Sequence, residues 1–127
     1  MNSKRRLEIA QAWVTFQKNW WAYDSVNKVC LEQPEDAWLL LQELVEMAET
    51  RRILEDVGAG PLEDFVRQHG EQYIGKIETL VGKNPRFKKA LGVVWIRGRG
   101  MRQNLAARFI ALGCQDLDNS KSDKSDP

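Results

Sequence analysis

The side chains best suited to chemistry in this sequence are one histidine, His69, and two cysteines, Cys30 and Cys114. A thiol or hydroxyl becomes a nucleophile when a base such as histidine lies beside it. Both cysteines are distant from His69 in the sequence, and no catalytic arrangement of serine, histidine and aspartate is evident. We interpret His69, which precedes Gly70, as a residue that bonds free carbonyls at a helix end. The sequence therefore predicts no catalytic residue and no enzymatic activity.

Metal and cofactor motifs are absent from the sequence. Neither C-x-x-C, H-E-x-x-H nor an EF-hand loop occurs. The stretch Gly58-Ala59-Gly60 fits no phosphate-binding glycine pattern, and Glu63 and Asp64 beyond it would repel an anion. Adjacent carboxylates of this kind point about 100° apart on a helix, unlike a facing acid and base. We expect no metal ligand and no cofactor.

Charged residues are divided unevenly along the chain, although the net charge is +1. Residues 32–64 hold ten acidic and two basic side chains, whereas residues 83–108, the basic segment, hold eight basic and no acidic side chains. A basic surface binds an acidic protein or nucleic-acid phosphates. Two alternatives are that the acidic and basic stretches neutralise each other within the fold, or that both are solvated faces. The basic residues are Lys83, Arg86, Lys88, Lys89, Arg97, Arg99, Arg102 and Arg108.

Five tryptophans are many for 127 residues, and two of them, Trp20 and Trp21, are adjacent. Neighbouring residues on a helix diverge by about 100°, so the two rings cannot share one face. We expect one of the pair, Trp21, to be partly exposed and to anchor a partner, because tryptophan is enriched at interface hot spots. The alternative is that both rings extend a wide core stripe.

Apolar residues recur at helical spacing through most of the chain, and alternating strand patterns are not evident. The predicted fold class is all-α, a compact bundle or a short array of about six to eight helices. Gly58 predicts a left-handed helix end, Gly60-Pro61 a corner, and His69-Gly70 another stop. We expect one domain over residues 1–114 and a disordered tail over residues 115–127, where polar residues dominate. The predicted helices are residues 4–21, 26–31, 34–48, 51–57, 61–69, 73–81, 87–95 and 105–112.

The cysteine content and the apolar runs indicate a compartment. Two cysteines are too few for a disulfide framework, which favours a reducing environment. The N-terminus is basic, but Glu8 and Gln11 interrupt the apolar stretch that a signal peptide needs. The longest uncharged run, residues 9–17, is far shorter than the roughly 20 apolar residues of a spanning helix. We expect a cytoplasmic protein with no membrane segment.

Several strings of residues resemble a family of small bacterial domains of unknown function. The resemblance covers about residues 5–97 and leaves residues 98–113 outside it. It implies a helical fold reminiscent of HEAT-type helix pairs and brings no established activity. The strings are Pro34-Glu35-Asp36-Ala37-Trp38, Gly58-Ala59-Gly60-Pro61-Leu62-Glu63-Asp64, His69-Gly70, Asn84-Pro85-Arg86-Phe87 and Val94-Trp95.

Together these observations predict a non-enzymatic protein-interaction module of bacterial origin, of the adaptor, regulatory or immunity-like kind. Stacked helix pairs offer binding surfaces more often than catalytic pockets. The predicted partner-binding residues are the eight cations of the basic segment together with Trp21. Nucleic-acid binding through residues 83–108 is the alternative, and it predicts affinity that falls steeply with salt. The near-neutral net charge favours a protein partner, whose identity, like the oligomeric state, the sequence leaves open.

Overall fold

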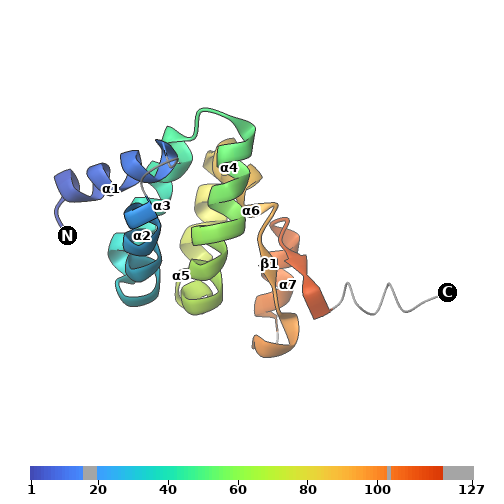
Figure 1. Cartoon of the computed structure of the whole chain (residues 1–127). Helices are drawn as coiled ribbons and strands as arrows, with labels where there is room; N and C mark the ends of the chain where they lie inside the picture. The colour runs from blue at the N-terminus through green and yellow to red at the C-terminus, as the bar shows by residue number, and fades with distance from the viewer. Residues whose placement is uncertain (16–19, 103, 119–127) are drawn as a thin grey trace.

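The computed structural model describes residues 1–15, 20–102 and 104–118, and their fold is all-α, as predicted (Figure 1). The helices stand in a row, with α1 to α3 at one end, α4 to α6 in the middle and α7 at the other end. None of the helices in the described part of the chain is long and apolar enough to cross a membrane. The elements are α1 (Ser3–Thr15), α2 (Trp20–Glu32), α3 (Pro34–Met47), α4 (Arg51–Val57), the π-helical turn η1 (Gly58–Leu62), α5 (Glu63–Lys83), α6 (Pro85–Leu91), β1 (Trp95–Ile96), the 3-10 turn η2 (Gly98–Gly100), α7 (Leu105–Ala111) and β2 (Gln115–Asp116).

The first two helices differ from the predicted continuous helix over residues 4–21. α1 ends at Thr15, and residues 16–19, which belong to the predicted helix, lie outside the described residues. Trp20 and Trp21 begin α2, which passes through residues 23–25 without the predicted interruption. The reason is visible in its buried face, because Ala22, Val26, Val29 and Cys30 recur at helical spacing across that stretch.

α3 buries five apolar side chains that recur at helical spacing: Ala37, Leu40, Leu41, Leu44 and Val45. Pro34 occupies its first turn, where an N–H would have no acceptor within α3, and Glu35 and Asp36 follow at the positive end of the helix dipole. Leu40 and Leu44 are fully buried, and α3 as a whole contacts α1 and α2 before it and α4, α5 and α6 after it. α3 thus connects α1 and α2 to the centre of the fold.

The predicted end at Gly58 and the predicted corner at Gly60-Pro61 are wrong, because α4, η1 and α5 form one continuous helical run. Gly58 is right-handed, with φ −64° and ψ −48°. Pro61 has no N–H, so it cannot bond the carbonyl four residues before it. The chain widens instead into a π turn, in which the Glu63 N–H bonds the Gly58 carbonyl. The glycine is needed for packing, since a Cβ there would lie 2.0 Å from the Ala90 carbonyl oxygen.

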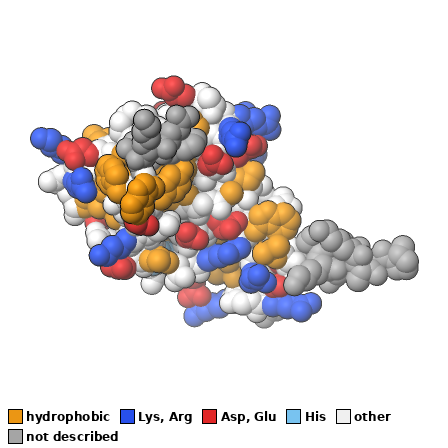
Figure 2. All heavy atoms as spheres, viewed as in Figure 1, with side chains coloured by type: hydrophobic (Ala, Val, Ile, Leu, Met, Phe, Trp, Pro, Cys, Tyr) orange, Lys and Arg blue, Asp and Glu red, His pale blue; other side chains and the backbone are white. Residues whose placement is uncertain are grey.

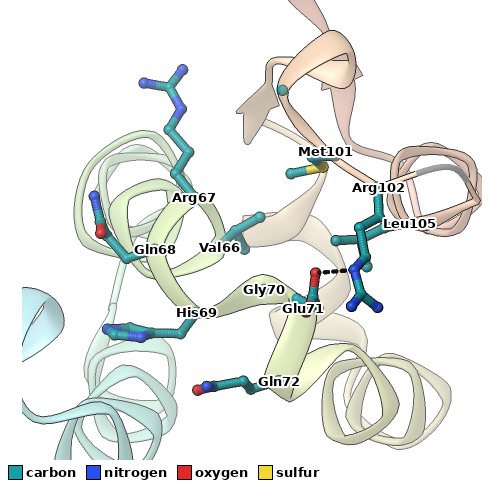
Figure 3. A pocket seen from close by; sticks show the side chains of 11 residues that line it. Val66, Arg67, Gln68, His69, Gly70, Glu71, Gln72, Met101, Arg102 and Leu105 are labelled. Carbon is teal, nitrogen blue, oxygen red and sulfur yellow. Dashed lines mark ion pairs between the residues drawn. The ribbon is translucent and has the colours of Figure 1, made fainter.

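α5 does not end at His69-Gly70 as predicted, but it bends there (Figure 3). Residues eight apart in a straight helix are separated by about 12 Å along its axis. The rings of Phe65 and Tyr73 nevertheless have centroids 4.9 Å apart. Both rings also pack against Trp38 of α3, so the bend folds the two halves of α5 around one aromatic cluster.

α6 ends at Leu91 rather than at the predicted residue 95. Trp95 is extended because two α5 side chains hold its backbone: its N–H donates to Glu63 Oε1 at 2.7 Å, and its carbonyl accepts from Arg67 Nε at 3.2 Å. β1 pairs in parallel with β2, with Trp95 opposite Gln115. The described structure therefore continues to residue 118, within the range predicted as a tail, and residues 119–127 lie outside the described residues.

Candidate interaction surfaces

His69 lies at the bend of α5, and it bonds the end of a different helix from the predicted one. Its Nε2 lies 2.8 Å from the carbonyl oxygen of Cys30, in the last turn of α2. A carbonyl can only accept, so Nε2 carries the proton. Within a helix that carbonyl would accept from the N–H of residue 34, but residue 34 is proline. His69 therefore satisfies a carbonyl that Pro34 leaves without its backbone donor.

Arg86 performs the same task at the end of α3. Its guanidinium donates to the Val45 carbonyl from Nε at 3.2 Å and from Nη2 at 2.8 Å, and to the Ala48 carbonyl. Arg86 lies in the first turn of α6. This turn is capped by Asn84, whose side chain accepts hydrogen bonds from the N–H groups of Arg86 and Phe87. His69 and Arg86 thus tie the pair α2 and α3 to the helices that follow. We assign this structural work to Arg86, which the sequence places among partner-binding cations.

Replacing His69 is expected to lower stability without abolishing the fold. His69→Ala leaves the Cys30 carbonyl without its donor, at a cost of about 1–3 kcal/mol in the free energy of unfolding. His69→Gln keeps a donor and is expected to recover part of that loss, while Gln68→Ala, at an exposed neighbour, is expected to change little. Urea denaturation of the four proteins makes the comparison. Equal stability of His69→Ala and wild type would contradict this role.

Both cysteines are buried free thiols, so neither is placed to act as a nucleophile. Burial raises the pKa of Cys30 to about 12, and burial likewise raises the pKa of Cys114 to about 12. Thiol reagents attack the thiolate. We expect both thiols of the native protein to react with a disulfide reagent at pH 8 far more slowly than after denaturation in guanidinium. Rapid labelling of one native thiol, followed by absorbance, would contradict the burial.

A cleft of about 320 Å³ lies between the bend of α5 and the segment around Met101 (Figure 3). Its polar side chains do not converge on one point. His69 points towards α2, away from Met101, and Glu71 is paired with Arg102 at 3.1 Å. Among the described residues no group of three or more histidine, cysteine or acidic side chains could hold a metal ion.

The structure divides the cations of the basic segment into two sets. Arg86 bonds helix carbonyls, Arg102 pairs with Glu71, and Arg108 pairs with Glu78, with Nε 2.9 Å from Oε2. The glutamates in those two pairs belong to α5 and not to residues 32–64. Within the described residues, no ion pair joins the acidic stretch to the basic segment. The side chains of the other five cations have neither an ion pair nor a hydrogen bond with any described residue: Lys83, Lys88, Lys89, Arg97 and Arg99.

α2 lies at the opposite end of the molecule from α7 (Figure 1). Trp21, in its first turn, lines a shallow groove of about 820 Å³. Its side chain is 40% exposed, and the Arg5 guanidinium lies 5.6 Å from its ring centre. The neighbouring Trp20 is 72% exposed, which the sequence did not single out. Figure 2 shows hydrophobic side chains gathered on this face, over α1 and the start of α2. We call it the tryptophan groove; its lining includes Lys4, Leu7, Glu8, Gln11, Trp21 and Met47.

The sequence gives a partial signal for this groove. α1 buries Ile9, Ala10, Trp13 and Val14 on one side. Leu7 departs from that pattern, since it is 42% exposed. Met47, from the last turn of α3, joins the groove through packing alone, so no spacing in the sequence reveals it.

The fold and these features define a small all-α protein with one open apolar groove and five exposed cations that have no ion pair among the described residues. The chain matches the model of a family of unknown function, DUF6869, over residues 10–113, and it belongs to that family. The match confirms the expected membership of a family of unknown function, and it extends past residue 97, where the resemblance in the sequence was expected to end. No curated protein and no solved structure matches the chain.

Proposed function

We propose that this protein is an interaction module, rather than an enzyme, and that it binds another polypeptide through the tryptophan groove. The observation that carries the proposal is the exposed ring of Trp21 in the lining of an open groove, with the more exposed Trp20 next to it in the chain. Large aromatic side chains are costly to leave in water and are the residues most enriched at interface hot spots.

The chemistry of the groove suits a protein surface better than a small molecule. Leu7, Met47 and the Trp21 ring provide a broad apolar floor, while Lys4 and Glu8 provide charges at its rim. A ligand pocket encloses most of its ligand, whereas this groove is shallow and open. An apolar centre with a charged rim is the usual anatomy of a protein interface.

Photo-crosslinking from the groove tests the proposal. A photoreactive amino acid placed at Trp20 is expected to form one defined adduct with a polypeptide in cells. The same group at Leu39, which is exposed on α3 outside the groove, serves as the comparison. The adduct partner is then purified, and its affinity is measured by calorimetry for wild type, Trp20→Ala/Trp21→Ala and Leu39→Ala. Leu39 is 46% exposed on α3 outside the groove and provides the matched control.

The expected result is an affinity at least about 30-fold lower for the double tryptophan variant, equivalent to about 2 kcal/mol, with Leu39→Ala near wild type. Circular dichroism confirms that each variant is folded. Undiminished affinity of the tryptophan variant, or adducts that form equally from Trp20 and Leu39, would overturn the proposal.

A second candidate, nucleic-acid binding, is favoured by the five cations of the basic segment whose side chains have no ion pair and no hydrogen bond in the described part of the chain. Lys88 and Lys89 lie in the last turn of α6, and Arg97 and Arg99 flank Gly98 in the next turn of the chain. Each phosphate neutralised by such a cation releases a counterion, so affinity falls with salt. Against this, six acidic residues of 32–64 also lack an ion-pair partner among the described residues and weaken any long-range attraction.

Fluorescence anisotropy separates the second candidate from the first. If it holds, labelled single-stranded RNA or duplex DNA binds at low salt, and Lys88→Glu/Lys89→Glu weakens binding about tenfold or more, while Lys28→Glu on α2 does not. Absence of binding at low salt would remove this candidate.

We place the protein in the cytoplasm of a bacterial cell, as an adaptor, regulator or immunity-like partner. Two observations support that placement. Both cysteines are free, buried thiols, as is usual in a reducing compartment, and the sequence resembles bacterial domains. Localisation of a tagged chain by cell fractionation tests the compartment.

A further inference from the structure

The groove carries opposite charges at its two ends. Lys4 and Arg5 lie at the N-terminal end of α1 and line the tryptophan groove. At the other end of α1 the groove continues into a second hollow of about 280 Å³, which shares Gln11 and Met47 with it. That hollow is lined by Glu46 and Glu49. The groove therefore runs from a basic end to an acidic end.

The distance between the ends is set by α1. Positions 4, 8, 11 and 15 lie one above the other on a helix, and all four line the groove. Thirteen residues at a rise of 1.5 Å give a surface of about 20 Å, or more than three helical turns. Between the charged ends lie the apolar side chains of Leu7, Trp21 and Met47.

The charges at both ends are available for a partner. Lys4, Glu46 and Glu49 are exposed and have no ion pair with any other described residue. Arg5 pairs with Glu8 at 3.3 Å, but half of each side chain remains exposed. Unsatisfied opposite charges at the two ends of one apolar surface are the pattern expected of a surface that is complementary to itself.

We propose that a second copy of this chain occupies the groove, in a two-fold dimer whose α1 helices run antiparallel. This inference rests on the proposed function, because it names the polypeptide that the tryptophan groove binds. In this arrangement Lys4 of each copy faces Glu46 and Glu49 of the other, and the two apolar centres cover each other. A two-fold axis forms every such contact twice, so one surface supplies both halves of the match.

Charge exchange between two variants tests the arrangement. In a dimer of Lys4→Glu chains, the carboxylate introduced at position 4 would face Glu46 and Glu49 twice. In a dimer of Glu46→Lys/Glu49→Lys chains, the introduced ammonium groups would face Lys4 twice. Each variant alone is expected to dimerise about tenfold or more weakly than wild type. When the two variants are mixed, each charged contact of the mixed dimer joins either two altered positions or two native positions.

In that mixed dimer, one end pairs the carboxylate at position 4 of the first variant with the ammonium groups at positions 46 and 49 of the second. The other end pairs the native Lys4 of the second variant with the native Glu46 and Glu49 of the first. Both ends therefore bring opposite charges together, and the mixed dimer is expected to recover wild-type affinity.

Sedimentation equilibrium of the full chain measures these affinities, starting from the wild type, for which a species of twice the 14.6 kDa chain mass is expected. Lys28→Glu, which reverses an exposed charge on α2 outside the groove, is the matched control and is expected to dimerise like wild type. Circular dichroism shows whether each variant is folded. Added salt is expected to weaken the wild-type dimer less than the double substitution Trp20→Ala/Trp21→Ala does.

The outcomes separate this inference from the proposed function. A monomeric wild type, or a mixture of the two charge variants that stays monomeric, overturns the dimer. If the photo-crosslinked adduct from Trp20 then contains a different protein, the groove still binds a polypeptide and the proposed function stands. If no adduct forms from Trp20 at all, both fall.

Discussion

Gly58→Ala is expected to destabilise the protein by about 3 kcal/mol or more, near or beyond the usual upper limit for overpacking. The added Cβ would lie 2.0 Å from the Ala90 carbonyl oxygen and 2.5 Å from Val93 Cγ2. A carbonyl of α6 cannot turn aside as a flexible side chain can, so the run α4 to η1 must separate from α6. A fall in melting temperature of roughly 10 °C follows for a chain of this size.

Gly60→Ala, two residues away in the same π turn, is the control. A Cβ at Gly60 would meet nothing within 4 Å. Alanine is favoured over glycine in helices by up to about 1 kcal/mol, so this variant is expected to match or exceed wild-type stability. Differential scanning calorimetry measures the melting temperatures of both variants and of the wild type. Two variants of equal stability would show that the contact of Gly58 with Ala90 is not as close as the structure has it.

Phe109→Ala is expected to cost about 3–5 kcal/mol, the range for removing a fully buried aromatic ring. Phe109 has no exposed surface and is the buried side chain of α7, where Ile110 beside it is 43% exposed. Its ring packs against the bend of α5 at Gly70, so its loss also frees α7 from the centre of the fold. Hydrogen exchange is expected to accelerate over residues 105–111 more than over α3, and Ile110→Ala should change neither measurement much.

A second substitution links Phe109 to the bend. A Cβ at Gly70 would lie 2.9 Å from Phe109 Cζ, so Gly70→Ala is expected to cost about 1–3 kcal/mol. Leucine is shorter than phenylalanine, so in a Phe109→Leu background the same change is expected to cost much less. Strictly additive losses in the double-mutant cycle would argue against contact between the two residues.

Helical periodicity alone is sufficient to predict the class of fold. α3 matches its predicted range because Pro34, the acidic first turn and the buried leucines all give the same signal. The errors fall where one residue type serves two purposes. The sequence predicts helix ends at Gly58 and Gly70, yet both are helical positions where a neighbouring element approaches too closely for a side chain. Sequence spacing cannot distinguish these uses, since the approaching atoms belong to residues distant in the chain.

For the candidate surfaces too, some features follow from the sequence and others only from the structure. The excess of cations in residues 83–108 and the adjacent tryptophans are properties of the sequence, and both are found at exposed positions. The structure decided which of those cations are engaged, because Arg86, Arg102 and Arg108 find partners on other helices. It also decided that Lys4 and Glu49 stand at opposite ends of one groove.

Composition and periodicity thus determined an all-α chain, its charge asymmetry and the lack of catalytic motifs, since each depends on residues that are near one another in the sequence. Tertiary structure alone decided that His69 bonds a carbonyl in the last turn of α2, that α5 bends and that residues of α1, α2 and α3 line one open groove. Each of these depends on the packing of segments that are distant in the sequence. A buried carbonyl needs a donor and a buried side chain needs space, and the residue that meets either need is not revealed by the local sequence pattern.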